Sequence, residues 1–195
     1  MITLRARKNQ LLKLTEEQQD ILIGCILGDA YIEKKGKIQL EQGISQEKYI
    51  QWKYQKLQSI SYGPPKKVLH HDKRNGKTTV AYRFWTRQFF REWRERFYKN
   101  EKKVFPADLI SLSPLSMAVW YMDDGCLAEH RRIILSTDGF DQESLDRIRQ
   151  LFLRCFDVKS TVKATGKLLI GTRETRKLMA RIRPYIVPSM AYKIL

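Results

Sequence analysis

The chain has 195 residues, of which 43% are hydrophobic, and its 37 Lys and Arg against 21 Asp and Glu give a formal net charge of +16. This length predicts one large domain or two small ones with a buried core, and this charge predicts a polyanionic partner, most often nucleic acid, with an anionic membrane surface as the alternative. No apolar run approaches the ~20 residues of a transmembrane helix, and no signal-peptide pattern is present, so we expect no membrane partner.

The three cysteines, Cys25, Cys126 and Cys155, form no Cys-x-x-Cys pair. We interpret them as free thiols in a reducing compartment. The three histidines, at positions 70, 71 and 130, are too scattered to predict a metal site. The compartment itself stays open between an organelle (mitochondrion or chloroplast), a bacterium and a phage.

The first half begins with an expected loose basic arm over residues 1–14, which carries four basic residues (Arg7 and Lys8 among them) and no acid. Thr15 with Gln18 three positions on is typical of a capping box and predicts a helix start. Asn75-Gly76 between two strand-like runs predicts a hairpin. The predicted elements are a helix over 15–28, strands over 31–33 and 37–44, a helix over 46–60, strands over 66–72 and 77–85, and a helix over 89–97.

The second half repeats this order after a linker. Its predicted elements are a helix over 114–123, a strand over 131–137, a helix over 142–156, a hairpin over 158–171 and a helix over 173–182. We therefore predict an N-terminal half over 1–98, a linker over 99–113 and a C-terminal half over 114–195, with the repeat visible in architecture rather than in residue identity.

Two apolar segments of similar design, residues 21–30 and 116–125, end in the acids Asp29 and Asp124, about half the chain length apart. Gly24 and Gly28 are one helical turn apart, so they lie on one helix face and permit close approach of a second helix. If that partner carries Ala118, the two carboxylates emerge at the same end of the helix pair. Adjacent carboxylates repel, and a shared divalent cation with oxygen ligands, hence Mg²⁺, relieves the repulsion. The alternatives are ordinary glycine packing and a turn after each helix.

Residues 23–29 and 118–125 resemble the two motifs of single-chain LAGLIDADG homing endonucleases. Residues 102–106 and 183–193 extend the resemblance over nearly the whole chain. One position departs from the motif symmetry, because Val119 stands where the first motif has Gly24.

The resemblance implies an α+β fold of two pseudo-twofold-related αββαββα halves whose saddle-shaped antiparallel sheets lie on DNA. It also implies that Asp29 and Asp124 bind catalytic metal ions, helped by the backbone carbonyls of Gly28 and Asp123. The implied ion is Mg²⁺, with Mn²⁺ as a substitute.

Two lysines, Lys103 and Lys193, match basic residues near the active sites of the family. There they polarise water or stabilise transition-state charge. A phosphate contact is the simpler alternative for both.

Polar side chains on the strand faces are candidates for reading or holding DNA, because Arg, Lys and Gln recognise base edges and about half of such contacts go to the backbone. These candidates are Lys37, Gln39, Glu41, His70, Arg83, Arg132, Lys159, Thr161 and Lys163.

The sequence thus predicts a monomeric, Mg²⁺-dependent endonuclease that cuts both strands of a long asymmetric DNA site and leaves short 3′ overhangs. One alternative is an intron maturase that binds RNA, and another is a DNA-binding regulator that does not cut. A nuclease built on His70, His71 and Asn75 is a weaker alternative, since the hairpin turn already explains those residues.

Overall fold

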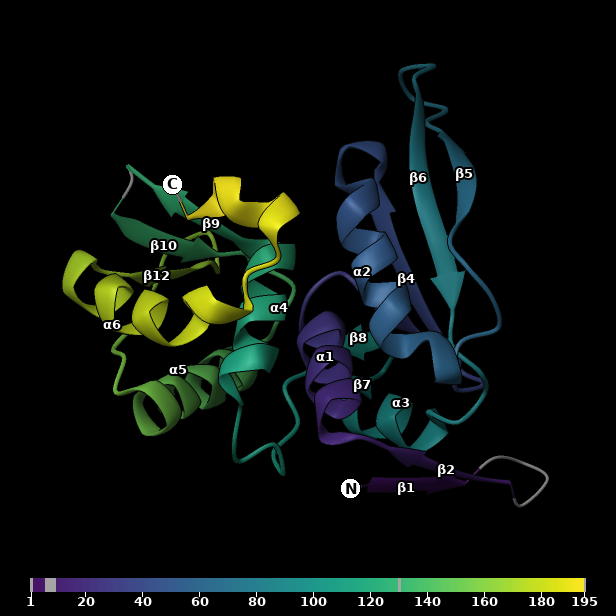
Figure 1. Ribbon diagram of the computed structural model, residues 1–195. Coiled ribbons are helices and arrows are strands. Elements are labelled where there is room, and N and C mark those ends of the chain that lie inside the picture. Colours follow the sequence, from purple (N-terminus) through teal and green to yellow (C-terminus); the bar gives the residue numbers. More distant parts are fainter. Residues whose placement is uncertain (1, 6–9, 130, 195) are drawn as a thin grey trace. The chain divides into compact units, whose positions relative to one another are not determined.

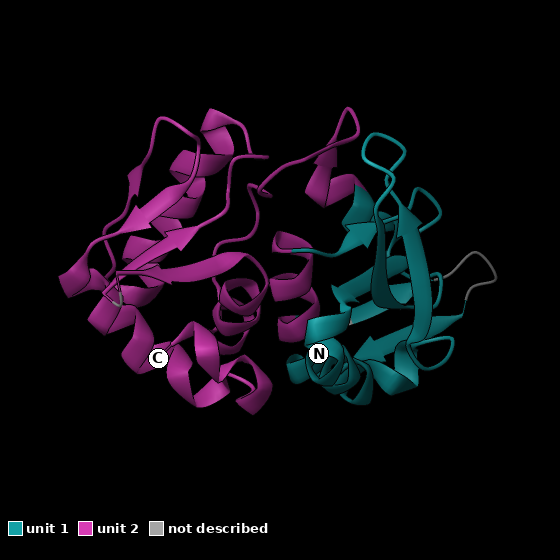
Figure 2. Ribbon diagram, turned by 90° about the horizontal axis from the view of Figure 1, so that it is seen from above, with its two compact units in different colours: residues 1–19, 29–94 teal, residues 20–28, 95–195 magenta. Residues whose placement is uncertain are grey.

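A computed structural model of the chain (Figure 1) describes residues 2–5, 10–129 and 131–194. Arg7, Lys8 and His130, mentioned above, lie outside these ranges. The chain forms two compact units, residues 1–19 with 29–94 and residues 20–28 with 95–195 (Figure 2). The second unit therefore contains most of the first motif helix.

The start of the chain is not a loose arm. Strand β1 (Ile2–Arg5) pairs antiparallel with β2 (Leu11–Leu14). This pairing was not predicted, because the basic and polar residues of this segment obscure the pattern of the buried Leu4 and Leu14. Helix α1 (Glu16–Leu27) then begins at the predicted capping box, where the Gln18 backbone N–H donates to the Thr15 hydroxyl (3.1 Å) and the Thr15 N–H to the Gln18 side-chain oxygen (3.2 Å).

The sheet of the first unit is antiparallel, with the strand order β3-β4-β6-β5. Alternation explains β4, because Ile38, Leu40 and Gln42 are buried while the residues between them are half-buried. The elements are β3 (Tyr31–Ile32), β4 (Ile38–Gly43), η1 (Ile44–Gln46), α2 (Glu47–Leu57), η2 (Gln58–Ile60), β5 (Lys66–His71), β6 (Thr78–Trp85) and α3 (Arg91–Phe97).

The predicted linker contains a short antiparallel ladder, β7 (Tyr98–Lys99) with β8 (Lys102–Lys103). Asn100 and Glu101 turn it with positive φ angles of 48° and 64°. Lys103 therefore sits on a paired strand rather than on a flexible connection.

The second unit repeats the element order, and its sheet has the order β11-β12-β10-β9. In both sheets the second strands of the two hairpins form the central pair. The elements are α4 (Pro114–Asp124), β9 (Gly125–Ala128), β10 (Arg132–Leu135), α5 (Gln142–Phe156), β11 (Thr161–Val162), β12 (Leu168–Ile170), α6 (Thr172–Ile182), η3 (Arg183–Tyr185) and η4 (Pro188–Lys193).

The α+β class and the αββαββα order of each half are confirmed. Strand β9 was missed, because its sequence Gly-Cys-Leu-Ala lacks the β-branched and aromatic residues typical of strands. Within the described ranges, the search for a helix long and apolar enough to cross a membrane finds none.

Candidate functional site

The end of α1 packs tightly against α4 within the second unit. A Cβ atom added at Gly24 would lie 2.5 Å from the Ser116 carbonyl oxygen and 2.7 Å from the Val119 Cβ, and one added at Gly28 would lie 2.6 Å from the Asp123 Cβ. Both positions therefore require glycine. Ala118 is fully buried in α4, but the atoms nearest to the two glycines belong to its neighbours on that helix.

Serines fix this helix contact at its start. The Ser113 hydroxyl caps α4 by accepting the Ser116 backbone N–H at 3.0 Å, and the Ser116 hydroxyl donates to the Asp20 carbonyl oxygen of α1 at 2.9 Å. Sequence reasoning missed Ser116, although its place one turn before Val119 was a usable signal, since small polar residues on an apolar helix often bond a neighbouring backbone.

The two candidate acids lie at the ends of their helices, Asp29 two residues after α1 and Asp124 as the last residue of α4. Asp29 is exposed in the first unit, where its Oδ2 accepts a hydrogen bond from the Gln42 side-chain amide at 3.1 Å. Asp124 is half-buried in the second unit, at the last residue of α4. Gln42 was also missed. It could have been noticed as a polar residue on the same strand face as the buried Ile38 and Leu40 of β4.

The two candidate lysines make matching contacts, both within the second unit. The Lys103 Nζ donates to the Gly28 carbonyl oxygen at 2.6 Å, and the Lys193 Nζ donates to the Asp123 carbonyl oxygen at 3.2 Å. Each carbonyl belongs to the residue that immediately precedes a candidate acid. The structure thus places one ammonium group beside each motif end, as a repeated arrangement.

Different devices hold the two lysines. Lys103 lies on β8, paired with Tyr98, whereas Lys193 lies on η4, and its backbone carbonyl accepts the Tyr121 hydroxyl at 2.6 Å. Burial of Tyr121, with a smaller contribution from the Cys126 charge, raises the pKa of that hydroxyl far above its usual value. The phenol therefore stays a hydrogen-bond donor throughout the neutral and mildly alkaline range. Tyr121 was not among the predicted site residues.

The oxygen donors at the motif ends suit a hard divalent cation. They are two carboxylates, of Asp29 and Asp124, and the two carbonyls that already stabilise positive charge from a lysine. Mg²⁺ prefers such oxygen ligands and keeps several waters. Among the described residues, no group of three or more His, Cys, Asp or Glu side chains is arranged so that it could hold a metal ion.

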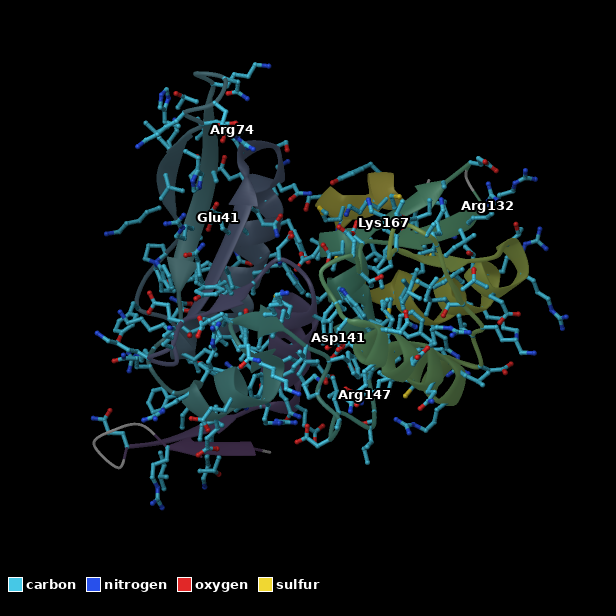
Figure 3. All side chains as sticks on the ribbon, turned by 180° about the vertical axis from the view of Figure 1, so that it is seen from behind. Glu41, Arg74, Arg132, Asp141, Arg147 and Lys167 are labelled. Atoms are coloured by element: carbon cyan, nitrogen blue, oxygen red, sulfur yellow. The ribbon has the colours of Figure 1, made fainter. Side chains whose placement is uncertain are left out.

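Four of the predicted DNA-contacting residues lie on the outer face of the first sheet, opposite the buried face. Glu41 is the centre of this group, because its carboxylate accepts a hydrogen bond from the Arg83 Nε and lies 2.8 Å from the His70 Nε2. Figure 3 labels Glu41 on this sheet. Gln39 is two residues away on the same strand face. Near this sheet, the Lys37 ammonium lies 5.3 Å from the centroid of the Tyr62 ring.

The predicted DNA contacts of the second unit are more dispersed. Arg132 on β10 pairs with Glu129 at 2.5 Å, and Thr161 is exposed on β11. Lys163 begins the turn to β12, where its N–H donates to the Lys167 carbonyl at 2.8 Å. Lys159 donates its backbone N–H to Glu174 at 3.0 Å, so it stands at the α6 side of the unit.

Fold and motif ends together define a two-unit αββαββα protein with an acid and a lysine at each motif. Residues 19–178 match the LAGLIDADG DNA endonuclease family. This chain belongs to that family.

Similar proteins fall into more than one functional group. The chain is 31% identical over 196 residues to the cytochrome b mRNA maturase bI2 of Debaryomyces hansenii, covering 93% of this chain and 74% of the relative. It is 27% identical to the probable intron-encoded endonuclease 1 of Wickerhamomyces canadensis, covering 96% and 88%. RecA proteins of mycobacteria also match, and the chain spans about half of their length.

The structure is similar to that of the homing endonuclease I-WcaI bound to its DNA recognition sequence. The TM-score is 0.85 at 25% sequence identity, over 94% of this chain and 88% of that one. The likeness therefore extends through both units.

Proposed function

We propose that this chain is a site-specific endonuclease that cuts both strands of a long, asymmetric DNA duplex and leaves short 3′ overhangs. Family membership supports the reaction class, and the similarity to I-WcaI, which is bound to DNA, supports the substrate. The single observation that carries the proposal is the repeated contact of a lysine ammonium with the carbonyl before each candidate acid.

In this proposal, Asp29 with the Gly28 carbonyl, and Asp124 with the Asp123 carbonyl, hold catalytic Mg²⁺, for which Mn²⁺ substitutes. Bound divalent ions supply positive charge for the scissile phosphate and a water of lowered pKa. The side-chain oxygens of the two acids would hold the ions and orient that water.

Lys103 and Lys193 keep a cation close to each acid. An ammonium fixed in this position stabilises the negative charge that develops on the phosphoryl oxygens during hydrolysis. Each lysine is already held by a hydrogen bond, so little reorganisation is needed when DNA binds.

Duplex binding is assigned to the polar side chains of the two sheets. The residues proposed to contact DNA are Lys37, Gln39, Glu41, His70, Arg83, Arg132, Lys159, Thr161 and Lys163. We propose that the protein acts as a monomer, because one chain already carries two complete motifs.

The test is cleavage of a duplex DNA library that contains the uninterrupted version of the locus surrounding the reading frame. Wild type and Asp124→Asn are compared in Mg²⁺ and in EDTA. A discrete cut that needs Mg²⁺ and is lost in the variant supports the proposal. Specific binding without any cut by wild type contradicts it.

An intron maturase is a second candidate function. It is favoured by the 31% identity to a maturase along 93% of this chain. The two functions are compatible in one protein if RNA and DNA use different surfaces.

A further inference from the structure

Helix α6 carries a dense positive charge on its solvent side. Its buried side consists of Thr175, Leu178 and Ile182. At 100° per residue, the opposite side and the first residue of η3 present four exposed arginines. These four residues, called here the arginine face, are Arg173, Arg176, Arg181 and Arg183.

The acids near this helix are engaged by other groups. Lys177 pairs with Asp157 at 2.8 Å and with Glu174 at 3.4 Å, and hydrogen bonding lowers the pKa of both carboxyls. Arg173 adds only a weaker charge effect to the same two acids. Within the part of the chain that the structure describes, no hydrogen bond or ion pair joins the guanidinium groups of the arginine face to another residue.

The arginine face lies opposite the side of α6 that packs on the sheet, although Lys159, one of the proposed DNA contacts, stands beside Glu174 of this helix. The Thr175 hydroxyl accepts the Ile133 N–H and donates to the Ile170 carbonyl, both at 3.1 Å, which fixes the buried side of α6 to the helix-covered face of the sheet (Figure 1). The opposite sheet surface bears Arg132 and Thr161. A duplex on that surface would leave the arginine face unused.

The chemistry of this face favours RNA with unpaired bases. Guanidinium groups bind phosphates through two hydrogen bonds and stack on bases. Tyr185, which is 42% exposed on η3, adds an aromatic ring two residues after Arg183, and exposed rings stack on unpaired bases. A membrane-binding helix would carry large apolar side chains beside its cationic residues. The residue at the centre of the arginine face is Ala180, whose side chain is small.

We propose that the arginine face together with Tyr185 binds RNA containing unpaired bases, at a site separate from the sheets. The inference names a surface for the second candidate function and does not depend on DNA cleavage. It also assigns a role to some of the basic residues behind the net charge of +16 that do not lie on the sheet surfaces.

The experiment compares wild type with the variant Arg173→Gln/Arg176→Gln/Arg183→Gln. The matched control, Arg147→Gln/Arg149→Gln/Arg154→Gln, removes the same charge from α5, where the guanidinium groups already bond Glu143, Asp146 and the Ile110 carbonyl. Binding is measured over a range of salt concentrations to three probes: the RNA transcript of the segment around the reading frame, duplex RNA of equal length, and the DNA copy of that segment. Circular dichroism verifies that each variant is folded.

We expect the α6 variant to bind the transcript at least ~10-fold more weakly, with a salt slope smaller by about 2, since each contact to single-stranded phosphate contributes ~0.7. The control is expected to bind it nearly as wild type does, and both variants to bind the DNA equally. Tyr185→Ala should weaken binding to the transcript and not to duplex RNA.

Equal losses in the two triple variants would overturn the proposal, because charge alone would then explain binding. An equal loss of transcript and DNA affinity in the α6 variant would overturn the separate site. Failure of the wild-type protein to prefer the transcript over duplex RNA would overturn the assignment to unpaired bases. Loss or retention of DNA cleavage has no bearing on these outcomes.

Discussion

The two sheets share one strand order and differ in size and outer surface. Strands β5 and β6 have 6 and 8 residues, whereas β11 and β12 have 2 and 3. Across the first sheet, neighbouring outer positions are Glu41, Arg83 and Lys66. The corresponding surface of the second sheet has a row that reads Cys126, Ile134, Leu169 and Thr161.

Because the strand order is shared while the outer surfaces differ, we infer that the buried, helix-covered faces of the two sheets determine the topology. There, both sheets bury alternating aliphatic residues such as Ile38 and Leu40, or Ile133 and Leu135. The outer faces need not be apolar. The first sheet therefore has a charged outer face and long strands, whereas the second has a partly apolar outer face and short strands. Under the proposed function, the first sheet would make more polar contacts with DNA, and an asymmetric target follows naturally.

The largest effect is expected at the two motif acids, which should have the same role in both units although the two sheets differ. Asp29→Asn or Asp124→Asn should each reduce double-strand cleavage by at least ~10³-fold, because a neutral amide is a poor ligand for Mg²⁺. DNA affinity should change little. Cleavage of a supercoiled plasmid and gel-shift binding measure the two quantities. Unchanged cleavage in both variants would contradict a role for either acid.

The next effect concerns the helix contact inside the second unit. Gly24→Ala should lower the free energy of unfolding by about 2 kcal/mol, because the new Cβ would lie 2.5 Å from the Ser116 carbonyl oxygen and overpacking typically costs 1–3 kcal/mol. Gly139→Ala is the control, since no atom lies within 4 Å of its added Cβ. Urea denaturation compares them, and equal stability would mean that α1 and α4 separate easily.

A third prediction distinguishes the two lysines. Tyr121→Phe removes the hydroxyl that holds the Lys193 carbonyl and leaves the β8 ladder of Lys103 intact. Without this hydrogen bond Lys193 is held less firmly, so cleavage of one DNA strand should slow about 10-fold and nicked plasmid should accumulate. The nick should lie on the same strand as in the variant Lys193→Met, in which Lys103 is unchanged.

The control for this prediction is Ser189→Ala on the same 3₁₀ helix, whose buried hydroxyl has no hydrogen-bond partner in the described part of the chain. It should linearise plasmid as wild type does. Equal slowing of both strands by Tyr121→Phe would indicate general destabilisation instead of positioning.

A smaller effect on stability is expected from the N-terminal caps of the corresponding helices α5 and α2. Helix α5 is capped by Asp141, whose carboxylate accepts the Ser144 N–H at 2.8 Å, whereas α2 begins at Gln46 without a side-chain cap bond. Hydrogen bonds from Ser144 lower the pKa of Asp141 below its model-peptide value of 3.8. A lowered folded-state pKa contributes stability above pH 3.8, and this contribution is lost as pH falls through the folded-state pKa.

Asp141→Ala should therefore cost about 1 kcal/mol at pH 7 and less near pH 3. Gln46→Ala, the matched change at α2, removes neither a charge nor a side-chain cap bond, so its cost should be the same at the two pH values. Thermal unfolding at the two pH values measures both. A cost for Asp141→Ala that is independent of pH would show that the carboxylate charge is not involved.

The smallest effect tests the sheets directly. Lys37→Ala and Lys163→Ala should each weaken DNA binding about 3-fold and reduce the salt slope by ~0.9, the value for one duplex phosphate contact. Fluorescence anisotropy between low and high salt gives the slope. An unchanged slope with lost discrimination at one base pair would assign that lysine to base reading.

Most of the helices and strands, and both motif ends, could be predicted from the sequence. Periodicity, the capping box at Thr15 and the Asn75-Gly76 turn depend on residues close in the chain, so local rules predicted them. The acid-ended helices were found for the same reason. The β1–β2 pairing and β9 were missed because their strands depend on partners rather than on their own composition.

The groups that support the acids follow from tertiary packing and could not be predicted from local sequence. Lys103 reaches the Gly28 carbonyl across 75 positions, and Tyr121 reaches the Lys193 carbonyl across 72. No local pattern specifies a hydrogen bond between residues so far apart in sequence, because its geometry follows from how whole helices and strands pack. The same is true of the arginine face, whose direction was fixed by the burial of Thr175, Leu178 and Ile182.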